Sequence, residues 1–256
     1  MKIFRCAYVL VFAVCVNAAG WAQSAATATP AQAAPPVDTA KQIATMQAKL
    51  DDWAQLGRYR ADNAALPAPA AGEKRVVFYG DSITDAWARN PSGFFPGKNY
   101  VGRGISGQTT PQMLVRFQQD VVHLKPAVVV ILAGTNDVAG NTGPSTPEMI
   151  EDNFESMAAI AKANGIRMVI SSILPAARYP WKPEVQPAEQ IRALNTRLKA
   201  LATREGLVYL DYYTPMVNAQ GGLDRELASD GVHPTEKGYA MMSPLAEKAI
   251  AEALAR

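Results

Sequence analysis

RVVFYGDSIT, residues 75–84, is the stretch of this chain that decides its fold. An apolar run at residues 76–79 suits a buried strand, and Gly80, Asp81 and Ser82 are typical of the turn that follows. A serine between a strand and a helix can lie at a helix N-terminus, where free backbone N–H groups stabilise negative charge. Ser82 is therefore a candidate nucleophile if a base and oxyanion donors occur elsewhere. The alternative is an ordinary helix-capping serine, and Asp81 suits bracing of the turn.

Short apolar runs alternate with helix-length amphipathic segments beyond residue 72, which is typical of a parallel sheet with helices on both faces. The β-branched run AVVVILA suits a central strand that is buried on both faces. The predicted strands cover residues 75–79, 99–101, 127–133, 167–171 and 207–210. The predicted helices cover residues 110–123, 147–164, 187–205 and 235–255, with Gly165 and Gly206 as stops before the last two strands.

Three polar motifs follow predicted strands, at the edge where open α/β sheets bind their ligands. Ser82 lies in the first, Gly104 in VGRGISG and Asn136 in GTND. The Asn136 amide could donate to an oxyanion without carrying a titrating charge, or the residue could simply cap a helix. Asp137, beside it, suits ordering of the loop.

VGRGISG also matches the dinucleotide-binding pattern GxGxxG, at Gly102, Gly104 and Gly107. That pattern belongs to the first strand of its unit and needs an acidic residue at the end of the next strand. Here the next strand runs into Gly134, so the context argues against a nucleotide site.

His233 is the candidate base, since it lies three residues after Asp230 in DGVHP near the C-terminus. In a turn, this spacing lets the carboxylate reach one ring nitrogen while the other faces Ser82. The alternative is a structural histidine after an ordinary Asp-Gly turn. His123, in QQDVVHLKP, fits the end of a helix better than a catalytic role.

These blocks, in this order, resemble the GDSL or SGNH hydrolase family over residues 75–256. The resemblance implies a flavodoxin-like three-layer α/β/α fold and a triad of Ser82, His233 and Asp230. It also implies an oxyanion hole made by Ser82 N–H, Gly104 N–H and the Asn136 amide. Since glycine has no Cβ, Gly104 could approach the oxyanion closely; the alternative is a glycine that is needed only for the turn. The first block reads GDSI rather than GDSL, which leaves the chemistry unchanged.

Residues 1–22 are typical of a secretory signal peptide. They contain two basic residues, an apolar run at 6–16 and then small residues, and the first choice for the cleavage site is after Ala22. The alternative is a retained anchor. We expect a periplasmic or secreted protein. Cleavage would remove Cys6 and Cys15 and leave 23 basic against 23 acidic residues, which argues against a disulfide, a cysteine metal site or binding to nucleic acid.

Residues 23–38 are rich in Ala, Pro, Thr and Gln and read as a disordered tether. A helix is expected from Thr39 to about residue 60, and its stripe of Ile43, Met46, Leu50, Trp53 and Leu56 could pack on the main domain. The expected organisation is thus a helical segment and linker at 39–72, broken by PAPAAG at 67–72, and a hydrolase domain at 73–256.

The expected activity is a serine esterase that needs no metal or cofactor and acts on small acyl esters of carbohydrates, without stable insertion in a membrane. Trp87, Tyr179 and Trp181 are candidates for stacking on a sugar ring, although large aromatics often only pack a loop. A lysophospholipase or acyl-thioester hydrolase would use the same machinery. A non-catalytic carbohydrate-binding protein on an esterase fold is the alternative of another class. The sequence leaves the oligomeric state open.

Overall fold

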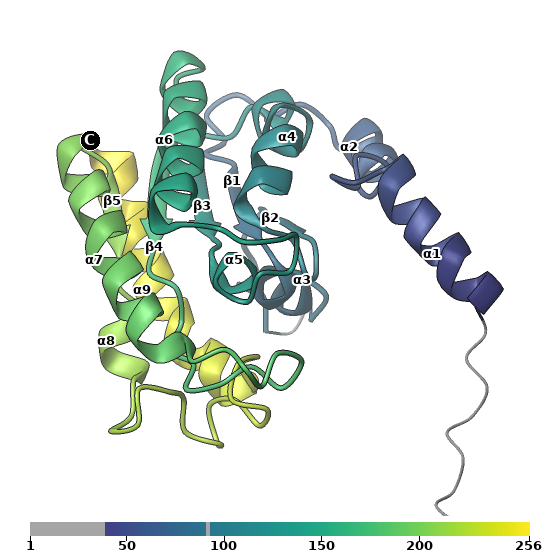
Figure 1. The fold of residues 1–256 in the computed structure, drawn as a ribbon. Coiled ribbons are helices and arrows are strands. Elements are labelled where there is room, and N and C mark those ends of the chain that lie inside the picture. Colours follow the sequence, from purple (N-terminus) through teal and green to yellow (C-terminus); the bar gives the residue numbers. More distant parts are fainter. Residues whose placement is uncertain (1–38, 91–92) are drawn as a thin grey trace, which may run out of the picture.

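β1 (Val76–Gly80) lies inside a parallel sheet of five strands, in a computed structural model that describes residues 39–90 and 93–256. Over this part of the chain the strand order is β2-β1-β3-β4-β5, the order of flavodoxin-like sheets (Figure 1). The predicted three-layer α/β/α fold is thereby confirmed. The expected signal peptide, tether and both cysteines lie outside the described residues.

The other strands are β2 (Tyr100–Gly104), β3 (Val128–Leu132), β4 (Arg167–Ser171) and β5 (Val208–Leu210). The longer helices are α1 (Thr39–Asp51), α4 (Thr110–Asp120), α6 (Pro147–Ala163), α7 (Pro187–Arg204) and α9 (Glu236–Ala255). The shorter ones are α2 (Arg60–Ala65), α3 (Ser82–Ala88), α5 (Thr135–Val138) and α8 (Tyr213–Met216), with a 3₁₀ turn, η1 (Val122–Leu124), that contains His123.

Alternate residues of each central strand face opposite layers, because side chains alternate across a sheet. Val77 and Tyr79 of β1 join the core under α4, α6 and α7, whereas Val76 and Phe78 join the core under α3 and α9. Both faces of β1 and β3 are fully buried, as the apolar runs predicted. The five predicted strands all form, and Gly165 and Gly206 end their helices at φ of 67° and 65°.

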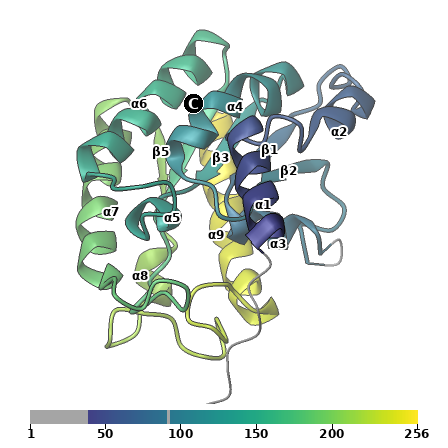
Figure 2. The same ribbon diagram turned by 45° about the vertical axis from the view of Figure 1, so that its right-hand side comes forward.

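The predicted helix from Thr39 to residue 60 is wrong in its length and its packing. α1 ends at Asp51, because the Asp52 carboxylate accepts from the N–H groups of Leu56 and Gly57 and closes a turn instead. Ile43, Met46 and Leu50 are exposed, and α1 projects from the side of the domain (Figures 1 and 2). None of the described helices is both long and apolar enough to cross a membrane.

Residues 53–66, hereafter the brace, are the N-terminal part that does pack on the domain, beside β2 and α4 (Figure 2). Tyr59 is 6% exposed, and its hydroxyl donates to the carbonyl of Gly104. Asn63 bonds the Asp120 carboxylate at 2.7 Å and accepts from Arg103 Nε at 2.7 Å. The brace therefore covers the open side of the edge strand β2.

A fully buried guanidinium joins the carboxyl ends of β1 and β2. Arg116 Nη2 donates to the Gly80 carbonyl at 3.0 Å and Nη1 to the Arg103 carbonyl at 2.9 Å. Its charge is balanced by Asp120 at 3.1 Å, which is also fully buried. The guanidinium lies 4.2 Å from the ring centre of Tyr79, which adds a cation–π contact. These bonds fix the two strand ends relative to each other.

Gly104 is required by packing at the end of β2. A Cβ at this position would lie 2.1 Å from Asp85 N on α3, where there is only backbone to yield. We expect Gly104→Ala to lower the free energy of unfolding by about 3 kcal/mol or more, measured by urea denaturation.

Gly57→Ala is the matched control, since the nearest atom to its Cβ would be a side-chain oxygen of Asp52 at 3.3 Å and not a backbone atom. We expect that variant to change stability by less than about 1 kcal/mol. Equal effects of the two substitutions would contradict the packing role of Gly104.

Candidate active site

Ser82, His233 and Asp230 form one hydrogen-bonded chain at the carboxyl end of β1. Ser82 Oγ lies 2.9 Å from His233 Nε2, and His233 Nδ1 lies 2.7 Å from Asp230 Oδ2. Asp230 Oδ1 also accepts from the backbone N–H groups of Val232 and His233 at 2.9 and 2.8 Å, which fixes the turn. The structure thus brings together the three residues that the sequence predicted, 151 positions apart at their widest.

The electrostatics of this turn favour an ionised Asp230. Partial burial opposes ionisation, but hydrogen bonds from the His233 side chain and from the His233 and Val232 backbone outweigh it. They hold the pKa of Asp230 below its ordinary value. A carboxylate in this state fixes the imidazole tautomer with its proton on Nδ1, leaving Nε2 to accept from Ser82.

Asp81 caps the helix that begins at Ser82. Its Oδ1 accepts from the backbone N–H of Ile83 at 3.0 Å, which is the bracing role expected for this residue. Burial raises the pKa of Asp81 to about 7, although the Ile83 bond and His233 act in the opposite direction. Ser82 is the first residue of α3, so its own N–H is not used inside the helix.

The expectation that Gly104 donates to an oxyanion is corrected by the structure. Gly104 is the register partner of Gly80, and Ile105 N–H donates to the Gly80 carbonyl. Because neighbouring residues of a strand point their peptide groups to opposite sides, the N–H and C=O of Gly104 point away from β1. Gly104 is also buried, and its carbonyl is bonded to Tyr59.

Gly107 is the glycine of this loop that faces the site. It is exposed, has φ of +81°, and a Cβ there would meet no atom within 4 Å. Its neighbour Ser106 donates to Asp85 on α3, and its neighbour Gln108 accepts from Asn136. Gly107 is therefore open to solvent, whereas Gly104 is not.

The Asn136 amide is 3% exposed and lies between the first two motifs. Its Nδ2 donates to the Gln108 carbonyl at 3.0 Å and to Asp81 Oδ2 at 3.2 Å. Its Oδ1 accepts from Asn141 Nδ2 at 2.7 Å, which fixes the orientation of the amide. Both amide hydrogens are therefore engaged within the protein.

Asp137 orders the loop, as the sequence suggested. Its carboxylate accepts from the N–H of Thr110 at 3.0 Å and from the Thr110 hydroxyl at 2.6 Å. Burial raises the pKa of Asp137, against the effect of these bonds.

Of the three aromatics predicted to stack on a sugar ring, Trp87 and Tyr179 are buried, so the prediction is corrected for both. Trp87 is 2% exposed, stacks on Tyr239 and bonds the Gly93 carbonyl, so it packs the core and does not contact substrate. Tyr179 is also fully buried, and its hydroxyl has no hydrogen-bond partner among the described residues. It supports Trp181, on which it stacks at 5.0 Å.

Trp181 is the aromatic at the mouth of the site. It is 39% exposed, and its ring centre lies 6.1 Å from that of His233. Its indole N–H donates to Asn141 Oδ1 at 3.1 Å, and Asn141 in turn donates to Asn136. A hydrogen-bonded line thus runs from the loop of Trp181 to the Asn136 amide.

A cleft of about 790 Å³ adjoins this line, between the end of α1 and the loop after β2. Gly107 and Asn141 line it on the side of the site, and Trp53, 43% exposed, lines it on the far side. The rest of the lining includes three charged side chains, Lys49, Asp52 and Arg58, and the amide and hydroxyl groups of Gln55, Gln112, Ser106 and Thr142. Another cavity, of about 540 Å³, lies at the amino ends of β4 and β5 and so is remote from Ser82.

Gly107, Gln108 and Asn141 were not predicted to belong to the site. Gly107 stands in the same VGRGISG motif, and its signal was the second glycine of a Gly-Ile-Ser-Gly turn. Nothing in the sequence marked Asn141 or Gln108. Within residues 39–90 and 93–256, no group of three or more His, Cys, Asp and Glu side chains is arranged to hold a metal ion.

Comparison with known proteins shows the family to which this chain belongs. Residues 78–241 match the model of the GDSL-like lipase/acylhydrolase family. Among curated proteins, the esterase TesA of Pseudomonas aeruginosa is 32% identical over 52% of this chain and 60% of its own length. An acetylxylan esterase of Xylanibacter ruminicola is 25% identical over 73% of this chain and 45% of its own length. The chain spans only about half the length of these two relatives.

Solved structures agree with the fold over nearly their whole length. A GDSL-like lipase from Bacteroides thetaiotaomicron is 47% identical, with a TM-score of 0.75 over 78% of this chain and 98% of that one. A structure from Bacteroides fragilis is 46% identical, with a TM-score of 0.77 over 79% and 98%.

The buried Asp81 carboxyl predicts a pH-dependent stability. Its pKa is about 7 in the folded protein and about 3.9 in an unfolded chain, so the folded state holds the proton more tightly. The free energy of unfolding contributed by this group is therefore greatest below about pH 4 and is lost as the pH rises to about 7. We expect Asp81→Asn to flatten this decline in urea denaturation at pH 4.5, 5.5 and 7.

Asp152→Asn, an exposed substitution on α6, is the control for the loss of one carboxylate. It should leave the pH dependence of the parent protein unchanged. A decline of the same slope in Asp81→Asn and in the parent would show that Asp81 ionises freely.

Proposed function

The chain belongs to the GDSL-like lipase/acylhydrolase family, and on this premise we propose that it is an exported serine carboxylic-ester hydrolase that removes small acyl groups, acetyl above all, from carbohydrate esters. The observation that carries the proposal is the continuous hydrogen-bonded chain of Ser82, His233 and Asp230. The reaction needs only these residues, the oxyanion donors and water.

His233 Nε2 removes the proton of Ser82 Oγ, which then forms a bond to the acyl carbon. The ester carbonyl becomes an oxyanion, and the imidazolium is stabilised by the Asp230 carboxylate. His233 then gives its proton to the leaving alcohol as the C–O bond breaks, which leaves an acyl-serine. Water, deprotonated by the same imidazole, releases the acid and restores the Ser82 hydroxyl.

The oxyanion lies, in this proposal, against the N–H groups of Ser82 and Gly107 and the Asn136 amide. Gly107 takes the place expected for Gly104, because only Gly107 is exposed. Asn136 can join by giving up its longer bond, the 3.2 Å contact with Asp81 Oδ2. Each preorganised donor of this kind typically contributes about 3–4 kcal/mol to the transition state.

The surroundings of the triad favour a carbohydrate ester over a long-chain ester. Trp181, beside His233, and Trp53, in the cleft, are 39% and 43% exposed, and exposed indoles suit stacking on a sugar ring. The cleft is otherwise lined by amide, hydroxyl and charged groups, which suit sugar hydroxyls and oppose a long acyl chain. The acetylxylan esterase of Xylanibacter ruminicola is a relative with such a substrate.

A lysophospholipase or thioester hydrolase is the second candidate. A relative whose name gives a substrate other than a carbohydrate is a platelet-activating factor acetylhydrolase subunit of Bos taurus, 26% identical over 65% of this chain. A purely carbohydrate-binding role has less support, because a binding protein has no need of the 2.9 Å contact between Ser82 and His233.

Export follows from the signal peptide expected at residues 1–22. Mass spectrometry of the protein from the periplasm or medium of the producing cell should give a chain that begins at Gln23. A chain that retains Met1 in the cytoplasmic fraction would contradict export and leave the esterase proposal standing.

Hydrolysis of p-nitrophenyl acetate, octanoate and palmitate and of acetylated xylan tests the activity and its substrate. We expect turnover to fall steeply beyond about six acyl carbons, because the cleft beside Gly107 and Asn141 is lined largely by polar and charged side chains, which disfavour a long acyl chain. Ser82→Ala should lose several orders of magnitude in kcat, since triad loss typically costs about 10⁴–10⁶. In the same assays, Trp181→Ala should raise KM for acetylated xylan more than for p-nitrophenyl acetate.

Val115→Ala, an exposed apolar substitution on α4, is the control for Trp181→Ala. Activity of folded Ser82→Ala equal to that of the parent would reject the esterase mechanism. A preference for palmitate over acetate would reject only the substrate.

A further inference from the structure

We propose that the brace, residues 53–66, is part of the catalytic apparatus: through Gln108 and Tyr59 it positions the loop of residues 105–109 that carries the oxyanion donor Gly107. The inference rests on the proposed function, since it needs an oxyanion to be stabilised. It gives a role to a segment that lies before the catalytic motifs and that the sequence resemblance left without one.

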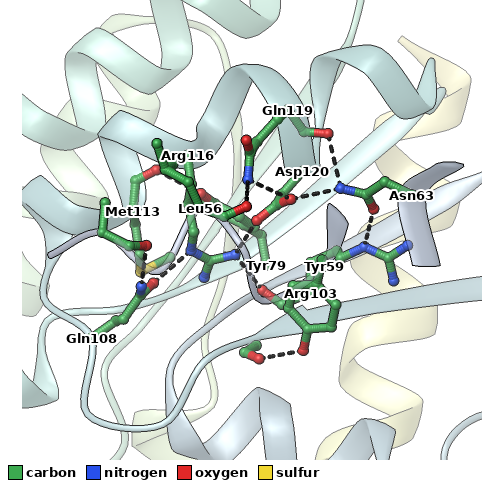
Figure 3. Close-up of polar contacts among 12 residues, drawn as sticks. Leu56, Tyr59, Asn63, Tyr79, Arg103, Gln108, Met113, Arg116, Gln119 and Asp120 are labelled. Atoms are coloured by element: carbon green, nitrogen blue, oxygen red, sulfur yellow. Dashed lines mark hydrogen bonds and ion pairs between the residues drawn. The ribbon is translucent and has the colours of Figure 1, made fainter. Parts of the chain in front are cut away.

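Gln108 is the residue through which the brace reaches the donors. It is fully buried, and its side chain is held at both ends: Nε2 donates to the Ala54 carbonyl at 2.8 Å, and Oε1 accepts from Arg116 Nε at 2.5 Å (Figure 3). Its main-chain carbonyl accepts from Asn136 Nδ2 at 3.0 Å. Gln108 is the next residue after Gly107, so this one residue contacts the brace, the buried cation and Asn136 and is covalently joined to Gly107.

The brace is fixed to the domain by a repeated kind of bond. Carbonyls at Trp53, Ala54 and Leu56 accept from the side-chain amides of Gln112, Gln108 and Gln119, at 2.6, 2.8 and 2.8 Å. Two of these glutamines lie on α4, whose Arg116 holds the ends of β1 and β2. Brace, α4 and loop therefore form one hydrogen-bonded unit.

Tyr59 fixes the start of the same loop. Its hydroxyl donates to the Gly104 carbonyl, on the side of β2 that has no neighbouring strand. Its ring also makes cation–π contacts with Arg58 and Arg103, whose guanidinium carbons lie 4.6 and 4.8 Å from the ring centre, which limits its movement. The loop is thus held before Gly107 by Tyr59 and after it by Gln108.

Gly107 needs such anchors because glycine has little conformational preference of its own. At φ of +81°, its peptide groups can swing with small energetic cost unless the flanking residues are fixed. An oxyanion donor lowers the activation barrier only if it already points at the developing charge. If the donor first had to reorient, the free energy spent on reorientation would offset the free energy gained from the hydrogen bond. Loss of an anchor should therefore reduce transition-state stabilisation more than substrate binding.

Gln108→Met and Tyr59→Phe test the inference in the full-length protein. Both keep the size of the side chain, so each removes only hydrogen bonds. We expect kcat for p-nitrophenyl acetate to fall about tenfold or more in Gln108→Met and roughly threefold to tenfold in Tyr59→Phe, less than loss of a donor itself. KM should stay within about twofold, because substrate contacts are unchanged.

A second readout separates positioning from a general loss of structure. The inhibition constant of a trifluoromethyl ketone, whose adduct with Ser82 carries an oxyanion, should rise in proportion to the loss of kcat/KM. The fraction of enzyme labelled by a fluorophosphonate at completion should stay that of the parent. Misfolding would instead lower that fraction and leave the inhibition constant of the remaining enzyme unchanged.

Tyr100→Phe is the matched control. Tyr100 begins β2, the strand that Gly104 ends, but its hydroxyl bonds Glu247 at 3.3 Å, away from the loop. It should keep the kcat and inhibition constant of the parent. Folded Gln108→Met and Tyr59→Phe with parental kcat would overturn the inference. Since Ser82→Ala would still be inactive in that case, the proposed function would survive.

Discussion

The buried guanidinium of Arg116 is the constraint on which the arrangement of this molecule depends. A charge without solvent must have partners, and its partners here are Asp120 and the carbonyls that end β1 and β2. Those carbonyls come just before the serine turn and the glycine loop. The same interaction that neutralises a buried charge therefore sets the spacing between the turn that carries Ser82 and the loop that carries Gly107.

Much of the fold could be predicted because it rests on local signals. Apolar runs such as AVVVILA can only be buried on both faces, and the spacing of runs and helices fixes parallel connections. Ser82, Asp230 and His233 could also be predicted from the sequence. A hydroxyl, a carboxylate and one imidazole in the motifs of a known family leave few other candidates for a triad. Asp230 and His233 reach each other within a single turn, so their contact needs no knowledge of the rest of the chain.

The wrong predictions concern residues whose role depends on the direction of a peptide group or on contacts with residues far along the chain. The sequence alone does not distinguish Gly104 from Gly107, since both are glycines of the same motif. Only the register of β2 with β1 shows that the peptide groups of Gly104 point away from β1. The burial of Trp87 follows from Tyr239, far along the chain, which stacks on it. The amphipathic stripe of α1 predicted packing, yet the contacts come from the irregular residues after it, which carry no periodicity.

The way the brace is attached has an evolutionary consequence. Its three carbonyl anchors belong to the main chain, so substitution of the exposed Trp53 or the half-buried Leu56 keeps the acceptor, whereas the buried Ala54 leaves little room for a larger side chain. The glutamines that donate to these carbonyls have no such freedom. Part of the evolutionary record of such an element therefore lies in the sequence of its partners.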